Sequence, residues 1–469
     1  MKFKQKNGKP SWAPLIPLAF VLGIASCGDG KGPSSSSGSS SSGSASNGGK
    51  TEKGPTTGRL LDTAVGGVAY VSPSGSGTTD EKGIFKYNHG DTVEFKLGGL
   101  VLGKPKGAAI VTPMELAGES SARLHNLLIL FQSLDADGNP ENGISIPAGA
   151  AAAVSASVNL DSDPAAFSAS PELQKAREAG GVASPAKTQA QADAHFLSQG
   201  ISLLSTNIWV KQDGAAASVI RASAGKGGEY LEGEATPDDS CDANRVCGGN
   251  LVSKAGVEYG AARVSEFDTR GFKFIGKPEI DTNLQAGLSH PRPTWRLRTD
   301  GSDLIASDIV TVQRERKQAS LFGELFHIAG TLEISSSKEP IKTEVKESRY
   351  SRMENEPKGI IGAWASDPAI IKTQTYFFFS NGKYMMVDPI GDLERDGHAS
   401  CGAPGIEFSS YTYDSGSKAL TLKGFTYDTN GCAGFSDNGA ASFNISADGN
   451  TATLETQNKT TLTLYRVSK

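Results

Sequence analysis

The sequence is poor in the residues and motifs that most enzymes and metal proteins concentrate at a site. Its 469 residues include five cysteines and six histidines, and no two cysteines have the C-x2-C spacing that is typical of zinc sites. It contains no G-x-S-x-G, H-E-x-x-H, P-loop or dinucleotide-binding glycine motif. No catalytic residue is therefore predicted, although distant acids and histidines can still assemble a site in space.

The chain also has no excess of positive charge. Its 46 basic residues face 51 acidic ones, which gives a formal net charge of −5. The first 26 residues hold four lysines and no acidic residue, so the remainder carries −9. This composition lacks the basic footprint of a nucleic-acid-binding protein, and no nucleic-acid partner is predicted.

The apolar run near the N-terminus, residues 15–27, is short. It covers about 13 residues, whereas a helix needs roughly 20 to cross the hydrocarbon core of a membrane. Four lysines precede it, and no acidic residue occurs before Cys27. A basic leader followed by a short apolar core is the layout of a secretory signal, so residues 1–26 are predicted to be a signal peptide.

The run ends in Ile24-Ala25-Ser26-Cys27, which resembles the lipobox of bacterial lipoproteins. The resemblance implies that Cys27 becomes the acylated first residue, whose fatty chains (palmitate among them) anchor the chain in a membrane. An ordinary cleaved signal with a chance cysteine is the alternative. In this family an aspartate directly after the cysteine favours the inner membrane, and Gly28 stands there, which implies the outer membrane. Whether the chain faces the periplasm or the cell surface stays open.

Residues 27–55 follow as a tether, because 16 of the 20 residues from Gly30 to Gly49 are serine or glycine. The four remaining cysteines fit an oxidising compartment, where disulfides persist. Closeness along the chain favours pairing Cys241 with Cys247 and Cys401 with Cys432, although four cysteines allow three pairings.

Residues 56–206 are predicted to form a β-sandwich module with a small helical layer. Short alternating runs broken by Gly and Asp predict antiparallel strands, and apolar residues three or four apart from Pro113 to Leu134 predict a helix. Further helices are expected over 171–179 and 188–204. The stretches 79–87 and 90–95 resemble small β-sandwich modules of proteobacterial surface lipoproteins and adhesin-like proteins.

A loop with oxygen-bearing side chains follows the first helix. Asp135, Asp137 and Asn139 alternate in it, and such spacing can wrap a calcium ion. The loop lacks the glycine and glutamate of the standard calcium pattern, and an Asx-rich turn explains the same residues. Calcium is the one cofactor that the sequence suggests.

Residues 207–352 are predicted to be a β-rich central region. It holds a basic stretch that suits an anionic glycan or lipopolysaccharide or, as the alternative, the solvated face of strands. The members of this stretch are Arg292, Arg296, Arg298, Arg314, Arg316 and Lys317. His290 and His327 have no acidic or nucleophilic partner that spacing singles out.

Residues 358–469 are predicted to form an antiparallel β-barrel or sandwich of seven or eight strands, with a hairpin at Asn381-Gly382. Gly362 and Trp364 at the start of a succession of hairpins resemble the lipocalin-like barrels, in which the tryptophan closes one end. A ligand held in this barrel would contact aromatic side chains. The predicted contacts are Trp364, Tyr376, Phe378, Tyr384 and Tyr411.

The sequence therefore predicts a mainly β, multi-domain lipoprotein of the bacterial outer membrane with a non-enzymatic role. Its predicted partners are the membrane, through the N-terminal lipid, and an unknown protein or glycan at the cell surface. A carrier of a small apolar ligand in the C-terminal barrel is the first alternative. A hydrolase of envelope polymers is the second.

Overall fold

The computed structural model describes residues 53–467 with some gaps. The gaps are 214–215, 236–245, 248–250, 253–254, 285–286, 292, 302, 313–314, 323–330, 339, 392–401 and 432–433. The predicted signal peptide, Cys27 and most of the tether lie outside the described residues, as do Cys241, Cys401 and Cys432. Cys247 lies in a described strand, but its side chain is outside the description, so the disulfide predictions stay predictions.

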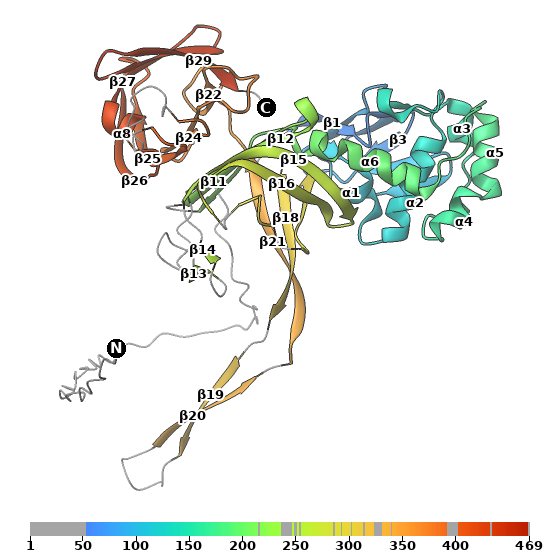
Figure 1. Cartoon of the computed structure of the whole chain (residues 1–469). Coiled ribbons are helices and arrows are strands. Elements are labelled where there is room, and N and C mark those ends of the chain that lie inside the picture. Colours follow the sequence, from blue (N-terminus) through green and yellow to red (C-terminus); the bar gives the residue numbers. More distant parts are fainter. Residues whose placement is uncertain are drawn as a thin grey trace, which may run out of the picture. The chain divides into compact units, whose positions relative to one another are not determined.

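The protein is mainly β and built from several sheets, as predicted (Figure 1). The N-terminal part contains small sheets ordered β5-β1-β8 and β4-β3-β6-β7, and the pair β2-β9. Their bounds are β1 Pro55–Leu60, β2 Val65–Gly66, β3 Ala69–Ser72, β4 Gly75–Thr78, β5 Ile84–Asn88, β6 Glu94–Leu97, β7 Leu100–Gly103, β8 Ile110–Val111 and β9 Ile144–Ser145. The pairs β1–β8 and β2–β9 are parallel, so the prediction of antiparallel strands was wrong for the pair β1–β8, and β9 was not predicted.

Helices cover these sheets and share one hydrophobic core with them. They are α1 Pro113–Ala117, α2 Ser121–Ser133, α3 Ala148–Ala153, α4 Pro164–Ser168, α5 Pro171–Ala179 and α6 Gln189–Leu204. The helix predicted from Pro113 to Leu134 is divided, because Gly118 adopts a positive φ of 60° and Ser120 begins a new helix as its N-cap. Thr188 caps α6 through a capping box with Gln191.

The central region forms a closed antiparallel barrel of eight described strands, in which sequence neighbours pair in order. They are β10 Trp209–Asp213, β11 Ala216–Ser223, β12 Glu229–Ala235, β15 Gly256–Asp268, β16 Gly271–Asp281, β17 Arg296–Asp300, β18 Asp303–Val312 and β21 Lys342–Arg352. The hairpins β13 Val246–Cys247 with β14 Leu251–Val252, and β19 Glu315–Phe322 with β20 Thr331–Lys338, are inserted between barrel strands. Figure 1 shows β19 and β20 continuing the direction of β18 and β21.

The C-terminal region is an eight-stranded antiparallel sheet, counted over the described residues, with the order β26-β25-β24-β23-β22-β29-β28-β27. Its strands are β22 Gly362–Ala365, β23 Thr375–Phe378, β24 Lys383–Asp388, β25 Gly405–Tyr413, β26 Leu420–Asp428, β27 Ala440–Ile445, β28 Thr451–Thr456 and β29 Thr461–Val467, and the short helix α8 Phe435–Asn438 precedes β27. A bridge between Ala419 and Ser442 joins the two outer strands. The sheet therefore curls toward a barrel, in agreement with the predicted barrel or sandwich.

Both barrel-like sheets begin with an inward-facing tryptophan that is fully buried. The Trp209 indole N–H donates to the carbonyl of Leu204 at 2.7 Å, and the Trp364 indole N–H donates to the carbonyl of Ile360 at 2.9 Å. The Arg466 guanidinium lies 4.0 Å from the centre of the Trp364 ring and binds carbonyls of the segment before β22. Each tryptophan thus fixes the chain that enters its sheet.

Candidate functional site

Acidic side chains occupy the interior of the central barrel at one end. Along β12 the side chains alternate, so Tyr230, Glu232 and Glu234 share one face while Leu231 belongs to a different buried cluster. The other end of the interior is apolar, because Ile201 and Leu204 of α6 pack there with inward-facing barrel residues. The acidic end is the candidate site.

Three of the carboxylates lie on neighbouring strands and face one another directly. Glu232 of β12 is the register partner of Glu258 of β15, and Glu258 is the register partner of Asp281 of β16. We call Glu232, Glu258 and Asp281 the carboxylate row. Like charges directly opposite each other on adjacent strands are destabilising, so the row requires protons or a cation between its members.

A β-bulge in β16 places Asp281 in this row. Tyr259 pairs with Ile280, but the next residue, Gly260, pairs with Pro278, so Glu279 is the extra residue. Without the bulge, Ile280 would stand opposite Glu258. Pro278 has no N–H to donate to the ladder, which suits a residue beside such an irregularity.

The loop after β16 folds back over the row and donates hydrogen bonds to it. The Leu288 N–H donates to Glu232 Oε2 at 2.8 Å, and the Ser289 N–H donates to Glu258 Oε2 at 2.9 Å. The Ser289 hydroxyl also donates to Glu258 Oε1 at 2.8 Å. These bonds hold the two buried glutamates, 3% and 0% exposed, in fixed orientations.

Gly287 makes this approach feasible. Its φ is +81°, and a Cβ added to it would lie 2.6 Å from Glu232 Oε2 and 2.6 Å from Glu258 Oε1. Any larger residue would therefore displace both carboxyl groups. Because Glu232 Oε2 and Glu258 Oε1 both lie 2.6 Å from the same point, the distance between them is at most twice 2.6 Å.

Burial raises the pKa of both glutamates. Desolvation raises the pKa of Glu258 to about 7, although hydrogen bonds from Ser289 and Tyr230 lower it in part. Desolvation also raises the pKa of Glu232 well above its usual value, and the neighbouring charges of Glu234 and Glu258 add to this. Burial thus favours the protonated form of both side chains.

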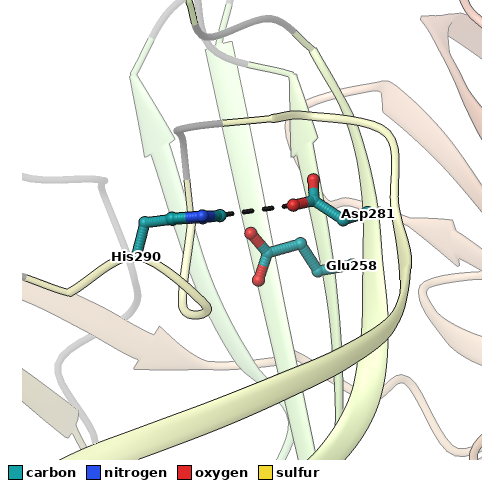
Figure 2. Close-up of side chains that lie close together, drawn as sticks. All are labelled: Glu258, Asp281 and His290. Carbon is teal, nitrogen blue, oxygen red and sulfur yellow. Dashed lines mark ion pairs between the residues drawn. The ribbon is translucent and has the colours of Figure 1, made fainter. Parts of the chain in front are cut away.

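His290 approaches the row from the same loop (Figure 2). Its Nδ1 lies 4.0 Å from Asp281 Oδ2 and 2.8 Å from the Ser289 hydroxyl oxygen. One ligand atom each from Glu258, Asp281 and His290 lies within 4.8 Å of the others, and among the described residues this group has the spacing of a metal site. Glu258 is buried, Asp281 is half-buried and His290 is exposed, so the group extends from the interior to the surface.

Asn283 adds a buried amide beside the same oxygens. It is 0% exposed, and its Nδ2 would lie 2.7 Å from a Cβ on Gly287, the same point that is close to Glu232 and Glu258. Its Oδ1 has no hydrogen-bond partner among the described residues. A buried oxygen without a partner costs about 1–3 kcal/mol, so an occupant that binds it is favoured.

A cavity of about 320 Å³ opens beside the row. Polar and charged groups face it, together with two aromatic rings. The chemically active residues of its lining are Glu232, Glu234, His290, Trp295, Asp308, Lys346 and Tyr350. Glu258 is not part of this lining, so the cavity is contacted by one of the two paired glutamates.

The predicted calcium loop has its acids turned toward their own backbone. Asp137 Oδ1 accepts from the Asn139 N–H at 2.8 Å, and Asp135 Oδ1 accepts from the Ser145 N–H at 2.9 Å. Asp135 is 1% exposed. The structure thus forms the Asx-rich turn that was the alternative, and calcium binding there stays a prediction.

The five aromatic residues predicted to contact a ligand lie together in the C-terminal sheet. Trp364, Tyr376, Phe378 and Tyr384 are buried in one core, and Tyr411 packs against it. Ring centres of Phe378 and Tyr411 are 5.1 Å apart. These side chains pack on one another, as in the filled state that a small barrel can adopt.

Two members of the predicted basic stretch, Arg296 and Arg298, have described side chains, and both are paired. Arg296 Nε lies 3.2 Å from Asp268 Oδ2, and Arg298 Nη2 lies 3.4 Å from Glu347 Oε1. Arg292 and Arg314 lie outside the described residues, as do the side chains of Arg316 and Lys317. Arg296 is buried at 8% exposure and Arg298 is half-buried, so the alternative of a solvated strand face was wrong for Arg296.

The sequence did not reveal the carboxylate row. Its members are 26 and 23 positions apart in the sequence, and no acidic residue stands close enough to His290 along the chain to indicate a partner. One signal was present in the sequence. Glu232 and Glu234 lie two and four positions after Tyr230, so in a strand all three side chains share one face, and acidic side chains on an inward face are unusual.

Among the described residues, no helix is both long enough and apolar enough to cross a membrane. Comparison of the chain with protein-family models, with curated proteins and with solved structures found no match.

Proposed function

We propose that this chain is a lipid-anchored protein of the bacterial cell envelope that binds a small polar solute in the mouth of its central barrel. The observation that carries the proposal is the polar cavity beside the carboxylate row. Its volume of about 320 Å³ is at the lower end of the range for small-molecule sites. The proposal narrows the predicted surface-binding role to one site and one class of ligand.

The lining favours a solute that is rich in hydrogen-bond donors or positively charged. Glu232, Glu234 and Asp308 supply carboxyl oxygens as acceptors, and Lys346 supplies one cation. The ring of Trp295 can contact a cation or an apolar edge of the solute, and the ring of Tyr350 has Lys211 Nζ 6.0 Å from its centre. A few placed polar groups among aromatic walls are typical of sites that orient a small ligand.

Binding is favoured over the hydrolysis of envelope polymers. A glycoside hydrolase needs two carboxyl groups that flank the scissile bond. Of the close pair in the barrel, Glu232 lines the cavity, whereas Glu258 is held behind it by Ser289 and Tyr230. The pair therefore suits a structural and recognition role better than catalysis, in which one carboxyl group acts as the acid and the other as the base.

The site in the central barrel is also favoured over the C-terminal sheet as a ligand carrier. The aromatic residues of that sheet are engaged with one another, for example Phe378 with Tyr384 at 5.3 Å between ring centres. In the central barrel, by contrast, the interior is polar at one end and bordered by the cavity.

Anchorage is tested by the variant Cys27→Ala. We expect the variant to leave the membrane fraction when envelopes are sedimented, because it lacks the acyl chains that contribute about 0.8 kcal/mol per buried methylene. The matched control is Ser46→Ala in the tether, which keeps the thiol. Equal sedimentation of Cys27→Ala and the control would contradict the anchor.

Binding is tested by native mass spectrometry of the full chain released from envelopes with detergent. We expect a non-covalent organic adduct on the wild type that is lost in Ala306→Trp, because Ala306 lines the cavity and is 4% exposed. Ser348→Trp is a second blocking variant, and Val345→Trp, at a position 55% exposed on the same strand, is the control. A wild type without adduct, or an adduct retained in both blocking variants, would contradict the proposal.

A further inference from the structure

We propose that Glu258, Asp281 and His290 bind a divalent transition-metal ion at the mouth of the central barrel. This inference rests on the proposed binding role of the barrel and names one ligand of that site. The three ligand atoms already lie within 4.8 Å of one another. Zn²⁺ represents this class of ion and is the probe in the experiment below.

The register of β15 with β16 supports a metal ion at this position. Glu258 and Asp281 are direct cross-strand partners, and the bulge at Glu279 brings them opposite each other. A sheet normally avoids two acids in this relation, since like charges there are destabilising. An ion between the two carboxylates turns this repulsion into attraction.

The second support is independent of the carboxylates. Asn283 is fully buried, its Nδ2 lies beside the Glu232 and Glu258 carboxyl oxygens and 3.5 Å from Glu234 Oε2, and its Oδ1 has no partner among the described residues. A bound water normally satisfies a buried oxygen of this kind, and an ion that carries water into the row provides one.

The loop holds the ligands in place through a further layer of hydrogen bonds. The Ser289 hydroxyl lies 2.8 Å from both Glu258 Oε1 and His290 Nδ1, and its N–H holds the other oxygen of Glu258. Such outer contacts fix the orientation of ligating carboxylates and imidazoles. Gly287 allows the loop to come this close, so the loop and the strands form one built site.

The donor set selects the class of metal. Calcium and magnesium prefer oxygen ligands alone, whereas an imidazole together with carboxylates suits zinc and its neighbours in the first transition row. Three protein ligands leave one position of a tetrahedral ion for water or a solute. His290 also lines the cavity, so that open position lies beside the space where a solute is proposed to bind.

The test titrates the full chain with Zn²⁺ by calorimetry, after the metal has been removed with a chelator. We expect one ion per chain in the wild type, and an affinity at least about tenfold lower in His290→Ala and in Asp281→Asn. His89→Ala, in the N-terminal part, is the matched control and should keep the wild-type affinity. Circular dichroism checks that the variants are folded.

Three results would overturn the inference. The first is that the wild type binds no Zn²⁺, and the second is that His290→Ala and Asp281→Asn bind Zn²⁺ as tightly as the control does. The third is that Ca²⁺ binds more tightly than Zn²⁺ and that its affinity is unchanged in His290→Ala. X-ray absorption of the zinc-loaded wild type provides a readout that does not depend on any variant. A shell of nitrogen and oxygen supports the site, and a sulfur shell overturns it.

The two experiments distinguish failure of the proposed metal site from failure of the proposed solute site. If Zn²⁺ binding is absent but the organic adduct still disappears in Ala306→Trp, the solute site stands and the metal assignment alone is wrong. If Zn²⁺ binds as expected while the wild type carries no adduct, the metal site stands and the solute proposal is wrong.

Discussion

Replacing Glu407 by glutamine should remove part of the pH dependence of stability in the C-terminal sheet. Glu407 is 0% exposed on β25, and it accepts hydrogen bonds from the N–H groups of Phe435 and Ser436 at 3.0 and 2.9 Å. Burial raises its pKa from 4.5 to about 7, and those hydrogen bonds limit the rise. The variant Glu407→Gln removes the titration but keeps the shape of the side chain.

The magnitude follows from the two pKa values. The folded state holds the proton up to about pH 7, whereas the unfolded chain releases it near pH 4.5. Between these values the folded state binds more protons, so stability falls as the pH rises and the loss is complete above the folded pKa. The difference between a pKa of 4.5 and one of about 7 corresponds to about 3 kcal/mol.

The free energy of unfolding of Glu407→Gln should therefore increase by about 3 kcal/mol relative to the wild type between pH 4.5 and pH 8. At acid pH the variant should be the less stable protein, because the two backbone N–H groups bind different oxygens of Glu407 and one of them would face the NH2 donor of glutamine. The contributions of other buried acids are the same in both proteins and cancel in the difference.

Hydrogen exchange of peptides from β23 to β25, measured by mass spectrometry at both pH values and corrected for the chemical exchange rate, reports this local stability. The control is Glu455→Gln, whose exposed carboxylate lies 2.9 Å from Lys459 Nζ and whose pKa is lowered by that contact. It should show no change over the same range. Parallel pH profiles of Glu407→Gln and the wild type would refute the reasoning.

Other predictions concern the remaining parts of the chain. Trp364→Ala should destabilise the C-terminal sheet by about 3–5 kcal/mol in thermal unfolding, whereas Tyr465→Ala, at a position 43% exposed, should change it by less than about 1 kcal/mol. Asp62→Asn should stabilise the N-terminal part on going from pH 4 to pH 8 relative to the wild type, since burial raises the pKa of Asp62 to about 6; urea unfolding at both pH values checks the sign. If the loop of Asp135 and Asp137 binds calcium, adding Ca²⁺ to chelated protein should raise the melting temperature, and Asp137→Asn should abolish the rise; an unchanged melting temperature in the wild type argues against the site.

The C-terminal strands were predictable because their signals are local. Side chains alternate with period two, and turn residues such as Gly382, at a φ of 77°, separate the runs. The hairpin expected at Asn381-Gly382 appears between β23 and β24, and eight strands are described where seven or eight were predicted. The helix expected over 171–179 appears with the same bounds, since Ser170 caps it and Pro171 opens it.

The N-terminal part was less predictable where pairing is not local. β8 pairs in parallel with β1 across about 50 residues of sequence, and no turn signal announces such a partner. Gly118 was not recognised as a break in the helical pattern, because an isolated glycine in a helical run is often tolerated. In both cases tertiary packing decided between local alternatives.

The sequence by itself determined the mainly β character, and it predicts the leader, the lipobox-like end at Cys27 and the serine and glycine tether, because each depends on neighbouring residues or on composition. Only the tertiary structure decided the closure of the central barrel and the meeting of Glu232, Glu258, Asp281 and His290. That meeting depends on strand register, on one extra residue at Glu279 and on a loop that folds back over the sheet. A shift of one residue in register turns every side chain of a strand to the opposite face, and no local pattern fixes that choice.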